Sequence, residues 1–137
     1  MPAAAKAHTK AGAKAFVVYY WQVVDYAQQQ LQPEPVLSVS ATDCAGCLAG
    51  VSFITKTMKR GGHVAGGNEA VKELHVAWRA LSGIRFAEAQ FELSNQAQTV
   101  TFPDGTVHRF PPSRDRVRML LATTSAGWQV KALEPLQ

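Results

Sequence analysis

The sequence lacks a long hydrophobic run and has only two cysteines in 137 residues. A transmembrane helix needs about 20 consecutive apolar residues. The most apolar stretch, residues 15–24, is interrupted by Gln22 and followed by Asp25. The start of the chain, MPAAAKAHTKAGAKA, also lacks the apolar core of a secretion signal. The sequence therefore predicts no membrane-spanning segment, and we interpret residues 1–14 as a flexible N-terminal linker.

The sequence also has little excess of charge. Lys and Arg number 14 against 10 Asp and Glu, and three of the lysines lie in the first 14 residues. A nucleic-acid-binding domain usually concentrates its basic residues on one face or helix, whereas here they are scattered. We therefore expect no nucleic-acid partner. The balance of 47% hydrophobic and 18% charged residues predicts one globular domain over residues 15–137.

Helical periodicity is confined to the first half of the chain. Apolar residues recur at helical spacing over residues 12–32 and predict a long helix that ends before Pro33 and Pro35. A short helix is expected over residues 36–40. A third helix is expected over residues 44–59, capped by Thr42 or Asp43 and closed by a glycine.

Strand-like alternation follows the segment GGHVAGG and continues to the end of the chain. Residues 87–93, for example, alternate small or apolar side chains with Glu and Gln. Pro103, Asp104 and Gly105 form the expected turn of a hairpin. Two main helices followed by four to six antiparallel strands predict an α+β fold, in which a curved sheet wraps the first helix as a cone.

Three segments in this order carry a family resemblance: the aromatic helix AFVVYYWQVVDYA, then DCAGC, then GGHVAGG. The chain resembles, over residues 15–133, a family of secreted actinobacterial lipoproteins of unknown function. That family is similar in architecture to the nuclear transport factor 2 (NTF2) superfamily, whose cone often encloses a pocket. The resemblance implies an extracytoplasmic, cell-surface domain whose only membrane association is a lipid anchor absent from this chain. It assigns no catalytic residue.

The motif DCAGC contains both cysteines and permits three interpretations. Cys44 in the first turn of a helix suits a redox thiol, but a thioredoxin-like site follows a strand. A zinc site needs three or four ligands, and the four histidines of the chain have no ligand spacing. In the exported protein that the resemblance implies, a disulfide between Cys44 and Cys47 is expected. We favour the disulfide, and we expect no metal and no cofactor.

The remaining candidates concern a pocket inside the cone. The residues that could line it are Tyr20, Asp25, Tyr26, Trp78 and Phe91. A buried Asp25 with a shifted pKa would indicate an enzyme base, but its place in a polar helical stripe favours a solvated side chain. GGHVAGG lacks the GK[ST] ending of a phosphate loop and is interpreted as a turn.

We therefore expect a non-catalytic extracytoplasmic domain that binds a small molecule or an envelope protein. The alternatives are a pocket enzyme of the isomerase or dehydratase type, and a homodimeric scaffold that pairs through its sheet. Arg79 and the arginines of residues 114–118 also suggest a basic outer sheet face.

Overall fold

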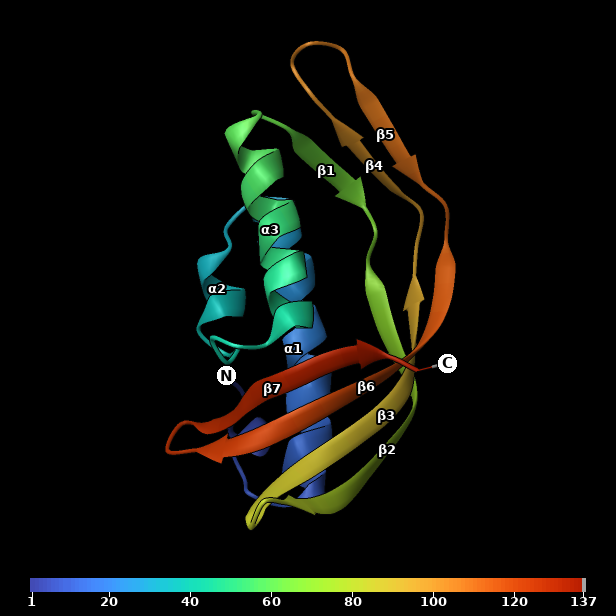
Figure 1. The fold of residues 1–137 in the computed structure, drawn as a ribbon. Helices are drawn as coiled ribbons and strands as arrows, with labels where there is room; N and C mark the ends of the chain where they lie inside the picture. Colours follow the sequence, from blue (N-terminus) through green and yellow to red (C-terminus); the bar gives the residue numbers. More distant parts are fainter. Residues whose placement is uncertain (137) are drawn as a thin grey trace.

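The computed structural model describes residues 1–136 and places the helices against two antiparallel sheets (Figure 1). The helical elements are η1 (Ala3–Ala5), α1 (Lys10–Gln30), α2 (Glu34–Leu37) and α3 (Ala45–Lys59). The strands are β1 (His63–Gly66), β2 (Glu69–Leu81), β3 (Ile84–Asn95), β4 (Gln98–Thr101), β5 (Val107–Phe110), β6 (Ser113–Thr124) and β7 (Gly127–Pro135). The expected α+β fold is confirmed.

Helix α1 presents a continuous apolar stripe to the core. Phe16 and Val17 are completely buried, and Tyr20 and Val24 continue the stripe. The helix ends at Leu31, which adopts the left-handed conformation with φ 54° two residues before the first proline. The predicted helix and its proline stop are therefore confirmed within two residues at each end.

The residues before position 15 are part of the folded domain, which differs from the expected flexible linker. Ala5 is completely buried, and the Thr9 side chain caps α1 by accepting a hydrogen bond from the Gly12 backbone N–H (3.0 Å). The indole N–H of Trp128 donates to the Ala7 carbonyl (3.0 Å). An alanine-rich segment has no apolar periodicity, so its packing against strand β7 could not be predicted from the sequence.

The motif DCAGC begins helix α3, but its capping residue is Cys44 rather than the predicted Thr42 or Asp43. The Cys44 sulfur accepts from the Cys47 backbone N–H (3.2 Å), and the two cysteines form the expected disulfide. Asp43 does not cap the helix because its carboxylate accepts from the Lys131 ammonium group (2.8 Å).

The glycine between the two cysteines, Gly46, is required by a close contact with strand β7. A Cβ at this position would overlap the carbonyl oxygen of Leu133, so helix α3 approaches strand β7 too closely for a side chain at residue 46. Together with the Asp43–Lys131 ion pair, this contact docks the start of α3 on the last strand. The motif is thus a structural junction.

The two sheets are halves of one long sheet that bends along a line. The strand orders are β1-β4-β5 and β2-β3-β6-β7, and each strand of the first sheet is joined directly to a strand of the second. The three connections are Gly67–Asn68, Gln96–Ala97 and Pro111–Pro112. We call these three connections strand breaks. Gly67 N donates to Ala97 O and Gln96 N donates to Asn68 O (both 3.0 Å), so the first two strand breaks lie side by side.

The inner face of the four-stranded sheet is apolar, as its alternation predicts. Ala87, Ala89 and Phe91 are completely buried in the same core cluster as α1. Two of the breaks contain residues that interrupt a strand. Gly67 in the first has a positive φ, which bends the strand. The two prolines of the third, Pro111 and Pro112, cannot donate a ladder hydrogen bond.

The outer face of this sheet carries paired charges rather than a free basic stripe. Glu88 is only 4% exposed because Arg118 (2.7 Å), Arg79 (3.0 Å) and Gln90 (3.1 Å) all donate to its carboxylate. Burial would raise the pKa of Glu88, but these hydrogen bonds outweigh it and hold the pKa below its usual value. Two of the arginines expected to meet an anionic partner, Arg79 and Arg118, are thus paired within the chain.

Candidate functional site

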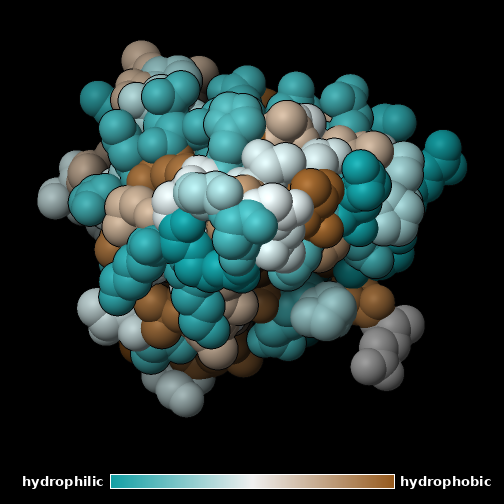
Figure 2. Space-filling view, turned by 90° about the horizontal axis from the view of Figure 1, so that it is seen from above, coloured by the Kyte–Doolittle hydropathy of each residue, from teal (hydrophilic) through white to brown (hydrophobic). Residues whose placement is uncertain are grey.

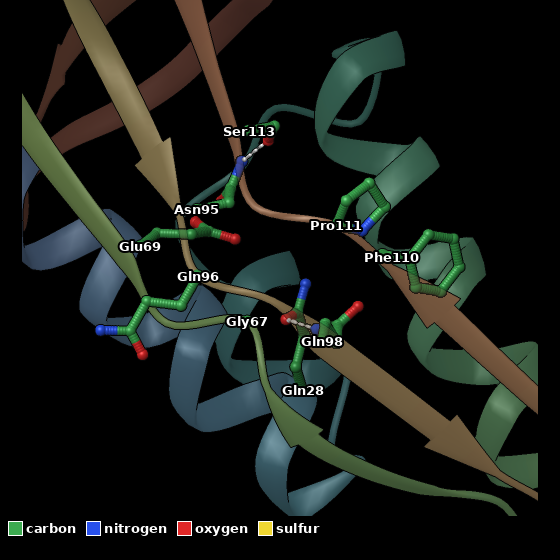
Figure 3. A pocket seen from close by; sticks show the side chains of 9 residues that line it. All are labelled: Gln28, Gly67, Glu69, Asn95, Gln96, Gln98, Phe110, Pro111 and Ser113. Atoms are coloured by element: carbon green, nitrogen blue, oxygen red, sulfur yellow. Dashed lines mark hydrogen bonds between the residues drawn. The ribbon is translucent and has the colours of Figure 1, made fainter.

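A polar pocket of about 220 Å³ lies at the bend of the sheet (Figure 3). It is lined by Gln28, Gly67, Glu69, Asn95, Gln96, Gln98, Phe110, Pro111 and Ser113. All three strand breaks contribute to this wall, and helix α1 supplies Gln28. Because most of the lining side chains carry amide, carboxyl or hydroxyl groups, the pocket suits a polar ligand. Its volume is below the roughly 300 Å³ at which drug-sized sites begin.

Two side-chain hydrogen bonds hold the wall together, and both are drawn in Figure 3. Gln98 Nε2 donates to Gln28 Oε1 (3.0 Å), which ties β4 to α1. Asn95 Nδ2 donates to Ser113 Oγ (3.0 Å), which ties the end of β3 to the start of β6. These bonds orient the amide groups before any ligand binds.

Glu69 connects this pocket with a second, inner cavity of about 110 Å³. The inner cavity lies between α1 and α3 and is lined by Tyr20, Trp21, Val24, Gln28, Val36, Gly46, Cys47, Gly50, Ile54, Glu69 and Leu133. Gln28 and Glu69 belong to both linings. Glu69 is the first residue of β2, directly after the Gly67–Asn68 break, and its side chain extends toward the other labelled groups in Figure 3.

Asp25 and Glu69 form a carboxylic acid pair. The Glu69 backbone N–H donates to Asp25 Oδ2 (3.2 Å). Asp25 Oδ1 and Glu69 Oε2 are buried and have no hydrogen-bond partner among residues 1–136. Buried polar atoms are nearly always hydrogen-bonded to protein or water. Glu69 lines both cavities, so its free oxygen is accessible to a water or another small molecule there.

Burial raises the pKa of both acids. The pKa of Asp25 rises to about 6, and the hydrogen bond from the Glu69 backbone opposes the rise. The pKa of Glu69 rises to about 8, because the negative charge of Asp25 adds to the effect of burial. At neutral pH the pair therefore holds about one proton.

Two aromatic residues of α1 complete the surroundings of Glu69. Burial raises the pKa of Tyr20 to about 12; the Ser40 hydroxyl opposes this shift and the charge of Glu69 adds to it. The Trp21 indole N–H is buried without an acceptor in the described part of the chain. The inner cavity thus has an unpaired donor in its lining residues as well as the unpaired acceptor of Glu69.

Two of the five residues predicted from the sequence lie at this site. Tyr20 lines the inner cavity, and Asp25 contacts Glu69. Asp25 is half-buried instead of solvated, as the sequence pattern had favoured, because the start of β2 covers it. This is the feature that would indicate a pocket base.

The other three predicted residues lie elsewhere. Tyr26 is 52% exposed, on the outer side of α1. Trp78 stacks on Trp128 with ring centroids 6.0 Å apart, and Phe91 is completely buried against Trp21 (6.3 Å). The aromatic signal in the sequence therefore identified core packing more than a cavity wall.

No cluster of three or more potential metal ligands occurs in the structure over residues 1–136. His63, His75 and His108 are all exposed on strands. The GGHVAGG segment forms strand β1 and the first break, where a turn was expected. Among the described helices, none is both long and apolar enough to cross a bilayer.

Most of the pocket wall was missed by sequence reasoning. Glu69, Asn95 and Gln98 each follow or precede a break, and Gln28 is one of several glutamines near the end of α1. The available signal was the polar character of the residues around the breaks, in GGNE, NQAQ and PPS. That signal alone is shared with ordinary loops, so only the alignment of the three breaks identifies the site.

Solved structures with the same fold are known, at sequence identities too low to indicate more than the fold. The intermembrane space region of the chloroplast protein ARC6 aligns with a TM-score of 0.62 and 14% identity, over 95% of this chain and 98% of that chain. The protein Aln2 from a Streptomyces species aligns with a TM-score of 0.56 and 12% identity, over 92% of this chain and 90% of that chain.

An NTF2-like superfamily protein from Salmonella enterica serovar Typhimurium aligns with a TM-score of 0.51 and 14% identity, over 93% of this chain and 92% of that chain. The expected NTF2-like architecture is therefore confirmed. No curated protein matches the sequence. The model of a family of unknown function, DUF6318, matches residues 1–131, and the chain belongs to that family.

Proposed function

We propose that this chain is the non-catalytic, extracytoplasmic domain of a lipid-anchored cell-surface protein, and that it binds a small polar ligand at Glu69. The observation that carries the proposal is the pair of buried, unpartnered oxygens on Asp25 and Glu69 beside a preformed pocket. A ligand that donates hydrogen bonds, above all an amine, would satisfy the free oxygen of Glu69, which lines the pocket.

The location part of the proposal is supported by the Cys44–Cys47 disulfide, because disulfides persist mainly in oxidising compartments. The resemblance to secreted actinobacterial lipoproteins points the same way. Protease treatment of intact cells that produce the full-length protein tests it. We expect the domain to be cleaved while a cytoplasmic marker survives; protection of both would overturn the location.

Native mass spectrometry of the purified protein tests ligand binding. We expect a species heavier than the polypeptide by one small molecule, which is lost on denaturation. Glu69→Gln removes the charge while keeping the shape, and should lose the extra mass. Glu34→Gln makes the same change at an exposed position and should retain it. Equal occupancy in both variants would place the ligand elsewhere.

Calorimetry in two buffers of different ionisation enthalpy then distinguishes a cationic ligand from a neutral one. The Asp25–Glu69 pair holds about one proton at neutral pH, so a cation such as methylammonium would displace that proton on binding. We expect release of about one proton per ligand for an amine. A neutral polyol such as glycerol should release none.

A pocket enzyme is the second candidate, favoured by one specific observation. A carboxyl group with a pKa near neutrality, such as Glu69, is suited to transfer a proton in either direction. The native mass experiment separates the two functions, because an enzyme would convert the bound compound over time. A homodimeric scaffold is less supported, since the outer sheet face carries paired charges rather than an apolar patch; the same spectrum reports the number of chains.

A further inference from the structure

A second groove lies between helix α3 and strands β4 and β5, and it shares Phe110 with the lining of the pocket at Glu69. It has a volume of about 190 Å³, and its lining includes Phe53, Phe102 and Phe110. Phe53 and Phe110 meet edge to face with centroids 6.4 Å apart, and Phe110 is 45% exposed. An aromatic ring left this open offers a binding surface for an apolar side chain.

The rim of this groove is basic. Lys56 of α3 and Arg60, which follows the end of that helix, line it, and no acidic residue belongs to the lining. The Arg60 guanidinium lies 3.7 Å from the centre of the Phe102 ring. Its ion pair with Asp104 is long (3.6 Å) and exposed, so the pairing is weak and the guanidinium remains accessible to another carboxylate. The charge of the rim is therefore complementary to an acidic partner.

Strand β5 adds a free edge to the same groove. It pairs with β4 on one side, and within residues 1–136 no strand pairs with its other side. All four residues of β5 are exposed. Phe102 N donates to Thr106 O, which by alternation along the ladder turns the backbone N–H groups of Val107 and Arg109 toward the free edge.

Seen from the end of the molecule that carries the β4–β5 hairpin, the surface is mainly hydrophilic, with hydrophobic groups in separate patches between polar ones (Figure 2). A narrow apolar groove with a charged rim and an adjacent open strand edge has the three components of strand-addition sites: backbone pairing, a side-chain pocket and charge selection. A flat apolar partner surface would find no matching area there.

We propose that this groove accepts an extended, acidic peptide segment of a partner protein, which adds a strand to β5. An apolar side chain of the segment enters the groove over Phe53 and Phe110, and its carboxylates face Lys56 and Arg60. The site differs from the pocket at Glu69, although Phe110 belongs to both linings.

Fluorescence anisotropy tests the proposal with a fluorescein-labelled heptapeptide that has phenylalanine at position 4, glutamate at positions 2 and 6 and valine elsewhere, because residues two apart share one face of an extended strand. We expect saturable binding that weakens as salt is raised, because the rim contacts are ionic. Lys56→Glu should weaken binding at least tenfold. Lys59→Glu reverses the same charge on the same helix outside the groove lining and should change binding less than twofold.

The backbone contribution is tested on the peptide, which leaves the protein unchanged. N-methylation at alternate residues removes the N–H groups that would pair with β5 and should weaken binding at least tenfold. The proposal is overturned if the peptide shows no saturable binding, if Lys56→Glu and Lys59→Glu have equal effects, or if the methylated peptide binds as tightly as the parent.

Discussion

Replacement of Glu69 by Gln should change how the stability of the protein depends on pH. In the folded state the pKa of Glu69 is raised from its usual 4.5 to about 8, because the ionised form is buried beside Asp25. A group with a raised pKa stabilises the fold fully at pH below its unfolded value, and this stabilisation is lost as pH rises toward the folded value. The loss therefore falls between about pH 4.5 and pH 8.

The magnitude follows from the size of the shift. At about 1.4 kcal/mol per pKa unit, the shift from 4.5 to about 8 sets an upper limit of about 5 kcal/mol. Glu69 borders a pocket that water can enter, so we halve this limit and expect about 2 to 3 kcal/mol. Glu69→Gln has no charge to bury and should lack this loss.

Urea unfolding of the oxidised protein from pH 4.5 to pH 8.5 provides the measurement. The quantity that matters is the difference in unfolding free energy between Glu69→Gln and the parent protein, because other titrating groups cancel in it. This difference should grow in favour of the variant as pH rises. Glu34→Gln, at an exposed position, should show no such growth. A difference that stays constant over this range would refute the assignment of a buried, protonated Glu69.

Three further predictions concern the scaffold. Gly46→Ala should destabilise the protein by about 1 to 3 kcal/mol in urea unfolding, since its Cβ would overlap the Leu133 carbonyl, whereas Gly50→Ala in the same helix meets nothing within 4 Å and should stabilise it by up to about 1 kcal/mol; equal effects would contradict the close contact. Reduction of the disulfide should lower the unfolding free energy by about 2 kcal/mol at most, because it closes a short loop; a complete loss of folding would show that we have underestimated it. Glu88→Gln should lower the unfolding free energy by roughly 1 to 3 kcal/mol in the same assay, because it removes the charge that pairs with two arginines. The loss is limited because the arginines can return partly to water. No loss would mean that the network adds no stability.

The pattern of apolar residues determined most of the fold. Helical spacing in α1, the proline stop after it, and the alternation along β3 each depend on contacts between near neighbours in the chain, so they can be recognised in the sequence. The hairpin turn at Gly105 was recognisable for the same reason, because a positive φ there (88°) requires a particular residue type.

Local patterns were less informative where two chemical roles share one composition. The alanines of residues 1–14 can form a linker or a docked segment, and only the contact of Ala7 with Trp128 decides between them. Asp43 and Cys44 could both cap α3. Asp43 instead forms an ion pair with Lys131 of β7, and Cys44 is the capping residue.

The candidate site was decided by the tertiary structure. In the sequence, Asp25 has the pattern of a solvated residue on a polar helical stripe, and Glu69 is one charge at the start of a strand. They lie 44 positions apart in the chain and become a pair only when the first strand break packs on α1. Burial, and therefore the raised pKa of each acid, arises from this packing, which no local sequence pattern specifies.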